Sequence, residues 1–230
     1  MGLIVIFIVF GILSFAVNAR LKSKFKKYSQ IRLRSNMSGK EVAERMLMDN
    51  GIHDVQVLSV KGQLTDHYNP LNKTINLSDT VYNGRSAASA AISAHECGHA
   101  VQHANAYSML QLRSSLVPIQ NASGRILNFI MMISIFGGFF VLGTSWQLLL
   151  VVVIGCYFVL TMFSFITLPV EFDASKRALE WIDKQGIVSS QEHEMAKDAL
   201  KWAAMTYVVA ALGSLVTLLY FLSVFLGGRD

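Results

Sequence analysis

Four long apolar runs without a charged residue constrain the fold of this 230-residue chain more than any other feature. They cover residues 2–19, 126–143, 148–170 and, roughly, 203–228. Each approaches or exceeds the length of about 20 residues that a helix needs to cross the hydrocarbon core of a bilayer. Only 15% of the residues are charged, which is unusual for a soluble domain. The sequence therefore predicts a mainly α-helical integral membrane protein with about four transmembrane helices.

The first apolar run has two interpretations. Val17, Asn18 and Ala19 resemble the cleavage site of a secretory signal peptide. However, no Lys or Arg precedes the run and a dense basic segment follows it, which reverses the charge order of a signal peptide. We therefore expect residues 1–19 to form an uncleaved transmembrane helix.

The distribution of positive charge predicts the orientation of the chain. Eight of the 20 Lys and Arg residues lie between Arg20 and Lys40, directly after the first apolar run. Lys and Arg close to the end of a span stay on the cytoplasmic side of the membrane. The net charge of +5 thus indicates topology rather than binding to nucleic acid.

This orientation gives a domain organisation. We expect a first span at 1–19, a cytoplasmic segment at 20–125, two spans within 126–170, a cytoplasmic helical segment at 171–202 and a last span at 203–228. The protein would then be a multi-pass cell-membrane protein with all of its long polar segments in the cytoplasm.

Local signals within the polar segments indicate a small α+β unit. Ser38 with Glu41, and Ser189 with Glu192, have the spacing of helix-capping boxes. The remaining expected elements are strands near 55–59 and 74–77 and helices over 86–104 and 170–185. The strand at 74–77 could bind an extended peptide along its edge, or it could be purely structural.

The expected helix over 86–104 carries the segment SAHECGHAVQH, which contains a metal-binding pattern. On a helix, His95 and His99 project from one face, one turn apart, so both imidazoles can bind the same ion. Glu96 is offset from them and can reach a water molecule on that ion. This is the H-E-x-x-H pattern of zinc peptidases, in which the glutamate is the general base. A buried helix whose histidines bind only protein groups is the less favoured alternative.

A catalytic zinc site also needs a third protein ligand. Glu171 is the favoured candidate, because two membrane crossings return it to the same side as His99 and because a carboxylate at the end of a span is costly unless engaged. It could instead only stabilise the beginning of a helix. The other possible ligands are His53, His67, Asp79, Asp173 and Glu180.

Two further residues of the cluster are expected not to be ligands. His103 lies two turns from His95, about 12 Å along the helix axis, so we expect it to support the site or lie at the surface. Cys97 points away from the ligand face, and we expect it to be a small packed residue.

HECGHAVQH together with LPVEFDASKRAL, set among membrane spans in this order, resembles the YugP-type neutral zinc metallopeptidases of bacterial membranes. The resemblance covers nearly the whole chain, and the HtpX-type membrane proteases are more distantly similar. It implies a zincin-like metallopeptidase unit in which His95, His99 and Glu171 bind Zn²⁺ and Glu96 is catalytic. The chain departs from the HtpX-type pattern at Ser175, where an aspartate is expected. Which group orients a ligand histidine is therefore open, with Asp173 as one candidate.

These observations predict a membrane-embedded zinc metalloprotease that hydrolyses peptide bonds of membrane-associated or unfolded proteins by means of zinc-activated water. Its partners would be polypeptide substrates and the lipid bilayer. Two other functions remain open: a non-catalytic membrane scaffold stabilised by zinc, and a zinc hydrolase of lipids or small amides.

Overall fold

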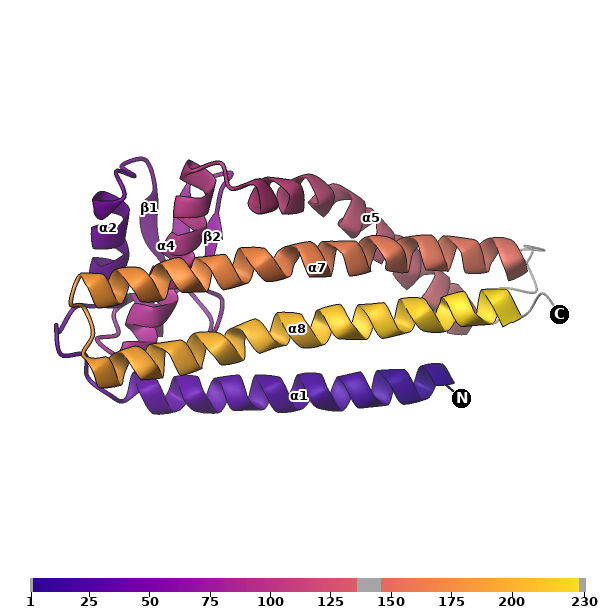
Figure 1. Cartoon of the computed structure of the whole chain (residues 1–230), viewed down its shortest axis with the longest axis horizontal. Coiled ribbons are helices and arrows are strands. Elements are labelled where there is room, and N and C mark those ends of the chain that lie inside the picture. The colour runs from indigo at the N-terminus through magenta and orange to yellow at the C-terminus, as the bar shows by residue number, and fades with distance from the viewer. Residues whose placement is uncertain (1, 136–145, 228–230) are drawn as a thin grey trace. The chain divides into compact units, whose positions relative to one another are not determined.

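The computed structural model describes residues 2–135 and 146–227 and is mainly helical there. Its helices are α1 (Gly2–Ser29), α2 (Gly39–Asp49), α3 (Asp79–Tyr82), α4 (Ala87–Ala104), α5 (Ser108–Ile135), α7 (Trp146–Lys184) and α8 (Ser190–Gly227) (Figure 1). Its strands are β1 (Gln56–Val60), β2 (His67–Asn69) and β3 (Thr74–Ser78). The chain divides into a mixed unit, Ala16–Gln111 with Pro169–Thr206, and a helical unit, Met1–Phe15 with Leu112–Leu168 and Tyr207–Asp230.

Three helices of the described residues, α1, α7 and α8, are long and apolar enough to cross a membrane. They contain the first, third and fourth apolar runs of the sequence. In the helical unit, Phe7, Ile12 and Phe15 of α1 are 56 to 77% exposed. Such a continuous apolar surface is unfavourable in water and suits contact with lipid.

The second apolar run, 126–143, lies only partly within the described residues. Helix α5 continues to Ile135, and the rest of the run falls in the segment 136–145 that is not described. A fourth span therefore stays a prediction.

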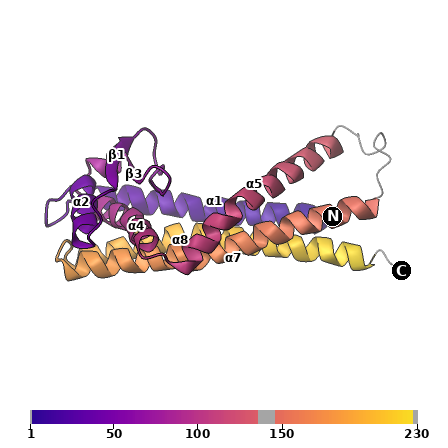
Figure 2. The same ribbon diagram turned by 90° about the horizontal axis from the view of Figure 1, so that it is seen from above.

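The core of the mixed unit forms where α2 packs on α4. Ser38 and Glu41 make the predicted capping box at the start of α2, with reciprocal hydrogen bonds between side chain and backbone. Val42 and Met46 then lie on one face of the helix and are fully buried, because residues three or four apart share a helix face. Figure 2 shows α2, α4 and the strands grouped together. This packing holds α4, the helix that carries the histidines.

The sheet has the order β1-β3-β2. Strand β3 pairs in parallel with β1, in the register Gln56↔Thr74, and antiparallel with β2, in the register His67↔Asn76. Of the two alternatives for the strand at 74–77, binding of a peptide along its edge is wrong and the structural role remains, because β3 is central and pairs with β1 on one side and with β2 on the other. The edge strand β2 was not predicted, since three residues are too short for a recognisable alternation of polar and apolar side chains.

The mixed unit also contains the turn between α7 and α8. Helix α7 ends before Gly186, whose φ of +62° suits glycine. Ser189 and Glu192 form the second predicted capping box at the beginning of α8. On the next turns of α8, Asp198 accepts hydrogen bonds from Lys24 and Tyr28 of α1. These bonds connect α1 to α8 near the start of α8.

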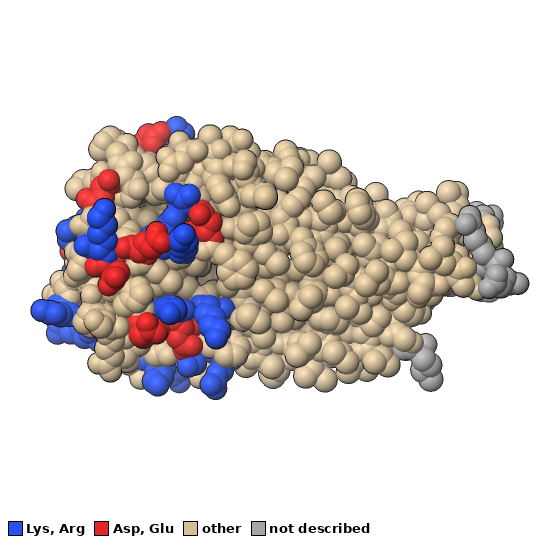
Figure 3. Space-filling view, in the orientation of Figure 1, with Lys and Arg blue, Asp and Glu red and all other residues tan. Residues whose placement is uncertain are grey.

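Charged side chains are restricted to one part of the surface that Figure 3 shows. The rest of that face has no Lys, Arg, Asp or Glu among the described residues. This separation is expected of a chain in which one part lies in lipid and another in water.

Candidate metal centre

The two histidines of the HECGH segment lie on one face of α4, as predicted. The ring centroids of His95 and His99 are 4.8 Å apart, and the ring planes are nearly perpendicular at 81°. Ser86 caps the helix by accepting a hydrogen bond from the backbone N–H of Ser89. The alanines that follow are buried in the core, so the backbone of α4 is fixed by packing on its other faces.

Helices α4 and α7 approach each other closely at Gly98. A Cβ atom placed on this glycine would lie 2.6 Å from the carbonyl oxygen of Ala174, which is closer than real Cβ contacts. Gly98 precedes His99, and Ala174 lies about one turn after Glu171 on α7. The missing side chain at Gly98 therefore lets the two helices bring their polar residues together.

Glu171 completes a compact group with the histidines. Its Oε2 atom lies 3.4 Å from Nε2 of His95 and 3.6 Å from Nε2 of His99. One ligand atom from each residue lies within 4.8 Å of the others. Ligand atoms about 2 Å from a tetrahedral zinc ion are separated from one another by about 3.3 Å. The chemistry and spacing of these side chains thus fit a zinc ion.

Electrostatics keep the Glu171 carboxyl of this group in its charged form. Burial raises the pKa of the Glu171 carboxyl, but hydrogen bonding to His95 and His99 outweighs this effect and holds the pKa well below its usual range. Burial lowers the pKa of His99, but the neighbouring Glu171 carboxylate raises it above the ordinary value overall. A buried carboxylate beside two imidazoles thus provides the charge that a divalent ion needs.

Glu96 lies next to the group without belonging to it. Glu96 is 8% exposed, and its Oε2 atom accepts a hydrogen bond of 2.9 Å from the backbone N–H of Tyr68 on β2. No described residue donates a hydrogen bond to the other oxygen, Oε1. Strand β2 therefore fixes one side of the carboxylate and leaves the other oxygen for a water molecule or a substrate.

A buried glutamine orients His99. The amide nitrogen of Gln102 donates to the carbonyl oxygen of Val170 and to Asp173, both at 2.8 Å. These bonds turn the amide oxygen toward Nδ1 of His99, at 3.0 Å, where it can only accept. His99 therefore carries a proton on Nδ1, and its Nε2 atom faces Glu171, where a metal ion would replace the proton shared with that carboxylate.

Ser175, the residue that departs from the HtpX-type pattern, contacts His95. The hydroxyl of Ser175 lies 3.1 Å from Nδ1 of His95. Asp173, the candidate suggested by the sequence, does not contact a histidine of the group. It accepts hydrogen bonds from Gln102 and Arg177 instead, and acts on His99 through Gln102.

The remaining candidate ligands lie elsewhere in the described structure. His53, His67, Asp79, Asp173 and Glu180 do not belong to the group. His103 is exposed, and its Nδ1 atom lies 2.8 Å from the hydroxyl of Tyr68. Cys97 is fully buried against α2, and burial raises the pKa of its thiol, which keeps it protonated. Neither His103 nor Cys97 belongs to the group of possible ligands among the described residues.

Three contributors to the site were missed from the sequence. Gln102 follows His99 by three residues and so shares its helix face, a spacing that could have indicated it. Ser175 was noted only as a departure from a pattern. Tyr68 acts through its backbone on a very short strand, and no local signal marks it.

A histidine pair on one helix and a glutamate from a second helix form the His₂Glu ligand set of catalytic zinc sites in peptidases. The family described as "Putative neutral zinc metallopeptidase" matches residues 3–226 of the chain. The chain is also 40% identical over 218 residues to the "Putative membrane protease YugP" of Bacillus subtilis (strain 168), covering 95% of this chain and 94% of that protein. No solved structure matches the chain significantly. The chain therefore belongs to this family of zinc metallopeptidases.

The contact at Gly98 leads to a first prediction. We expect Gly98→Ala to force α4 away from α7, to lower stability by about 1–3 kcal/mol and to weaken zinc binding. Zinc content and the thermal unfolding midpoint of the purified protein measure both effects. Gly124→Ala is the matched control, because a Cβ there meets nothing within 4 Å. Equal zinc content and equal midpoints in the two variants would contradict the role of this contact.

The glutamine gives a second prediction. Gln102→Leu keeps the approximate volume of the side chain but leaves Nδ1 of His99 without its acceptor. Loss of such a supporting group weakens metal binding about 10- to 100-fold. Competition with a chelator measures the zinc affinity, and Gln111→Leu, at an exposed position of α5, is the control. An unchanged affinity in Gln102→Leu would show that packing alone orients His99.

Proposed function

We propose that this protein is a zinc endopeptidase of the bacterial plasma membrane that cleaves membrane-associated or unfolded polypeptides on the cytoplasmic side. The observation that carries the proposal is the group His95, His99 and Glu171, with ligand atoms within 4.8 Å of one another. No fourth His, Cys, Asp or Glu joins this group among the described residues. Three protein ligands are typical of catalytic zinc sites, whereas structural sites are closed by four, which favours an enzyme over a zinc-stabilised scaffold.

The chain supplies the acid and base for the reaction. A zinc ion held by the three residues would provide Lewis acidity toward the attacking water and the scissile carbonyl. Glu96 accepts the proton of that water at its free oxygen and donates it to the leaving amine. The N–H of Tyr68 keeps the carboxylate in place during both proton transfers.

The proposed topology follows from the charge distribution. Spans at 1–19, within 126–170 and at 203–228 would place the segments 20–125 and 171–202 in the cytoplasm. All residues of the metal centre and the groups that orient them belong to these two segments, apart from the backbone carbonyl of Val170 at the end of the third run.

The position of Glu171 supports the preference for substrates near the bilayer. This ligand directly follows the apolar run 148–170, so the site would lie close to the membrane surface. We expect one unfolded peptide sequence to be cleaved faster when it is tethered to the lipid vesicles that hold the enzyme than when it is free in solution. Initial rates at equal total peptide concentration measure the difference. Equal rates would reject the preference, and cleavage of lipids or small amides without cleavage of peptides would reject the proposed substrate class.

A further inference from the structure

A series of polar contacts runs from the surface of α7 to the metal ligand His99, and its outermost member is Arg177. The Nε atom of Arg177 donates a hydrogen bond of 2.6 Å to Oδ2 of Asp173. The same oxygen accepts the hydrogen bond of 2.8 Å from the amide nitrogen of Gln102, whose amide oxygen lies 3.0 Å from Nδ1 of His99. Arg177 therefore reaches a metal ligand through two intermediate side chains.

The pair of Arg177 and Asp173 differs from an ordinary ion pair on a helix surface. Residues four apart on one helix often pair, and such pairs contribute little when water surrounds them. Here the two side chains are only 32% and 25% exposed. The carboxylate also binds Gln102, which is fully buried. The pair thus connects the surface of α7 to a buried group of the metal centre.

The turn after α4 holds the guanidinium group of Arg177 as well. The backbone N–H of Tyr107 donates to the carbonyl oxygen of Gln102 at 2.9 Å, and that of Ala106 donates to the carbonyl oxygen of His103 at 3.1 Å. With the φ of +50° at Ala106, these bonds form the Schellman motif that ends many helices. The motif fixes Tyr107, whose ring centroid lies 5.9 Å from the guanidinium carbon, within the range of a cation–π contact.

The carboxylate of Asp173 determines which end of the Gln102 amide faces His99. An amide presents an oxygen and an NH₂ group, which exchange places when the amide turns over. In the reversed orientation the oxygen would face two acceptors, Asp173 and the carbonyl oxygen of Val170, and the NH₂ group would face Nδ1 of His99. His99 would then carry its proton on Nε2, the atom that is available to a metal ion. Asp173 opposes this reversal as long as Arg177 keeps it in place.

We propose that Arg177 is a positioning residue of the metal centre, which raises the zinc affinity by holding Asp173 against Gln102 and so keeping the His99 proton on Nδ1. This role rests on the metal centre of the proposed function. Its effect is opposite in sign to that of charge alone. Removal of a positive charge near a cation site strengthens binding of the cation through Coulomb's law, whereas loss of a group that orients a ligand weakens it.

A double-mutant cycle on the full-length, detergent-purified protein tests this role. We expect Arg177→Gln to lower the zinc affinity about three- to tenfold, as measured by competition with a chelator. In a Gln102→Leu background, where no amide remains to be oriented, the same substitution should change the affinity by less than about twofold. The coupling between the two positions is the signature of a positioning role, because a general loss of stability would act in both backgrounds.

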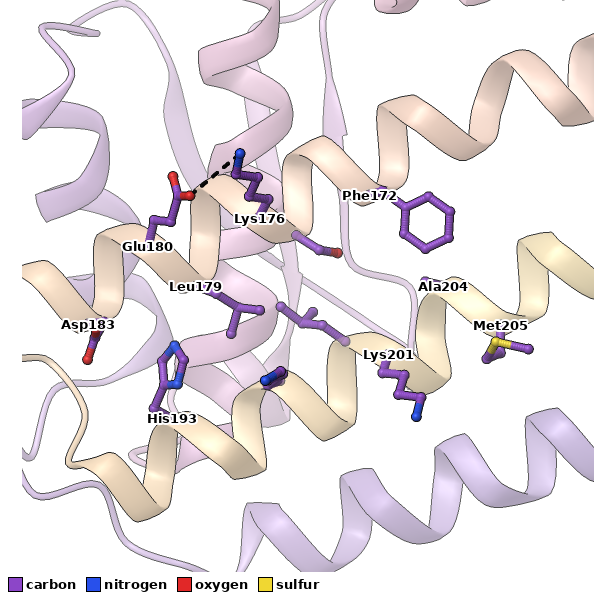
Figure 4. Close-up of a pocket in the computed structure, with 12 residues that line it drawn as sticks. Phe172, Lys176, Leu179, Glu180, Asp183, His193, Lys201, Ala204 and Met205 are labelled. Carbon is purple, nitrogen blue, oxygen red and sulfur yellow. Dashed lines mark ion pairs between the residues drawn. The ribbon is translucent and has the colours of Figure 1, made fainter.

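Lys176→Gln is the matched control, since it removes the same charge from the neighbouring position of α7. The Lys176 side chain is 71% exposed, and Figure 4 shows its ammonium group paired with Glu180. We expect its zinc affinity to equal or slightly exceed that of the wild type in both backgrounds. This variant measures the effect of charge alone.

Three results would overturn the role of Arg177. The zinc affinity of Arg177→Gln could be unchanged or increased, it could fall equally in the two backgrounds, or it could fall no further than that of Lys176→Gln. If thermal unfolding shows that Arg177→Gln does not fold, Arg177→Met takes its place in both backgrounds. Methionine has a similar length and keeps an apolar contact with the Tyr107 ring.

Zinc affinity also separates failure of this role from failure of the proposed function. A wild-type protein that binds no zinc would overturn both the metal centre and the role of Arg177. Zinc binding that is the same in wild type and Arg177→Gln would overturn only the role of Arg177. Peptide hydrolysis is not needed for either result, so a protein without measurable activity can be tested in the same way.

Discussion

Replacing Glu96 by Gln is expected to abolish hydrolysis while leaving the zinc content unchanged. A glutamine has nearly the same shape and still accepts the hydrogen bond from Tyr68, but it cannot take a proton from water. Loss of a general base typically slows a reaction about 10²- to 10⁴-fold. The rate of peptide cleavage and the zinc content of the same preparation are the measurements.

Glu44→Gln is the matched control, because it makes the same chemical change at a half-exposed position of α2. It should retain both zinc and activity. A Glu96→Gln protein that cleaves peptides at the wild-type rate would remove Glu96 from the mechanism. If the wild-type protein binds zinc but cleaves no peptide, the result would favour the alternative of a non-catalytic membrane scaffold stabilised by zinc.

Replacing Glu171 by Ala is expected to cause loss of zinc as well as activity. The substitution removes one of three ligands and the negative charge that balances the ion. We therefore expect the affinity for zinc to fall by more than about 100-fold. This is a larger loss than that expected when a residue that only orients a ligand is removed. Zinc retained after dialysis against a chelator provides the measurement. Glu171→Asp, which keeps the carboxylate on a shorter side chain, should be intermediate.

Glu180→Ala is the control for this experiment. It removes a carboxylate from the same helix, but at an exposed position outside the ligand group. Retention of zinc by Glu171→Ala at the wild-type level would show that another residue is the third ligand. Comparable loss in Glu180→Ala would mean that the substitutions act through the stability of α7.

Much of the fold could be predicted because its signals are local. The apolar runs predicted α1, α7 and α8, and two capping boxes marked the beginnings of α2 and α8. The pairing of strands was not predictable in this way. The register in which β2 pairs with β3 depends on tertiary packing. In addition, a strand of three residues is too short to show the alternation of polar and apolar side chains that marks a strand in a sequence.

The same distinction applies to the site. The spacing of His95 and His99 is a property of one helix, whereas the proximity of Glu171 could be expected only from topology and from a resemblance. The groups that orient the histidines depend on how α4 crosses α7, where Gly98 lies directly against Ala174. Gln102 and Ser175 acquire their roles only at that crossing.

The separation of the ligands along the chain has a consequence for biosynthesis. His95 and His99 leave the ribosome before the apolar runs 126–143 and 148–170, and Glu171 leaves it afterwards. A nascent chain therefore has an incomplete ligand set until the third run has been translated. Delayed completion would keep the nascent peptidase inactive toward other polypeptides at the translocon until its own insertion is well advanced.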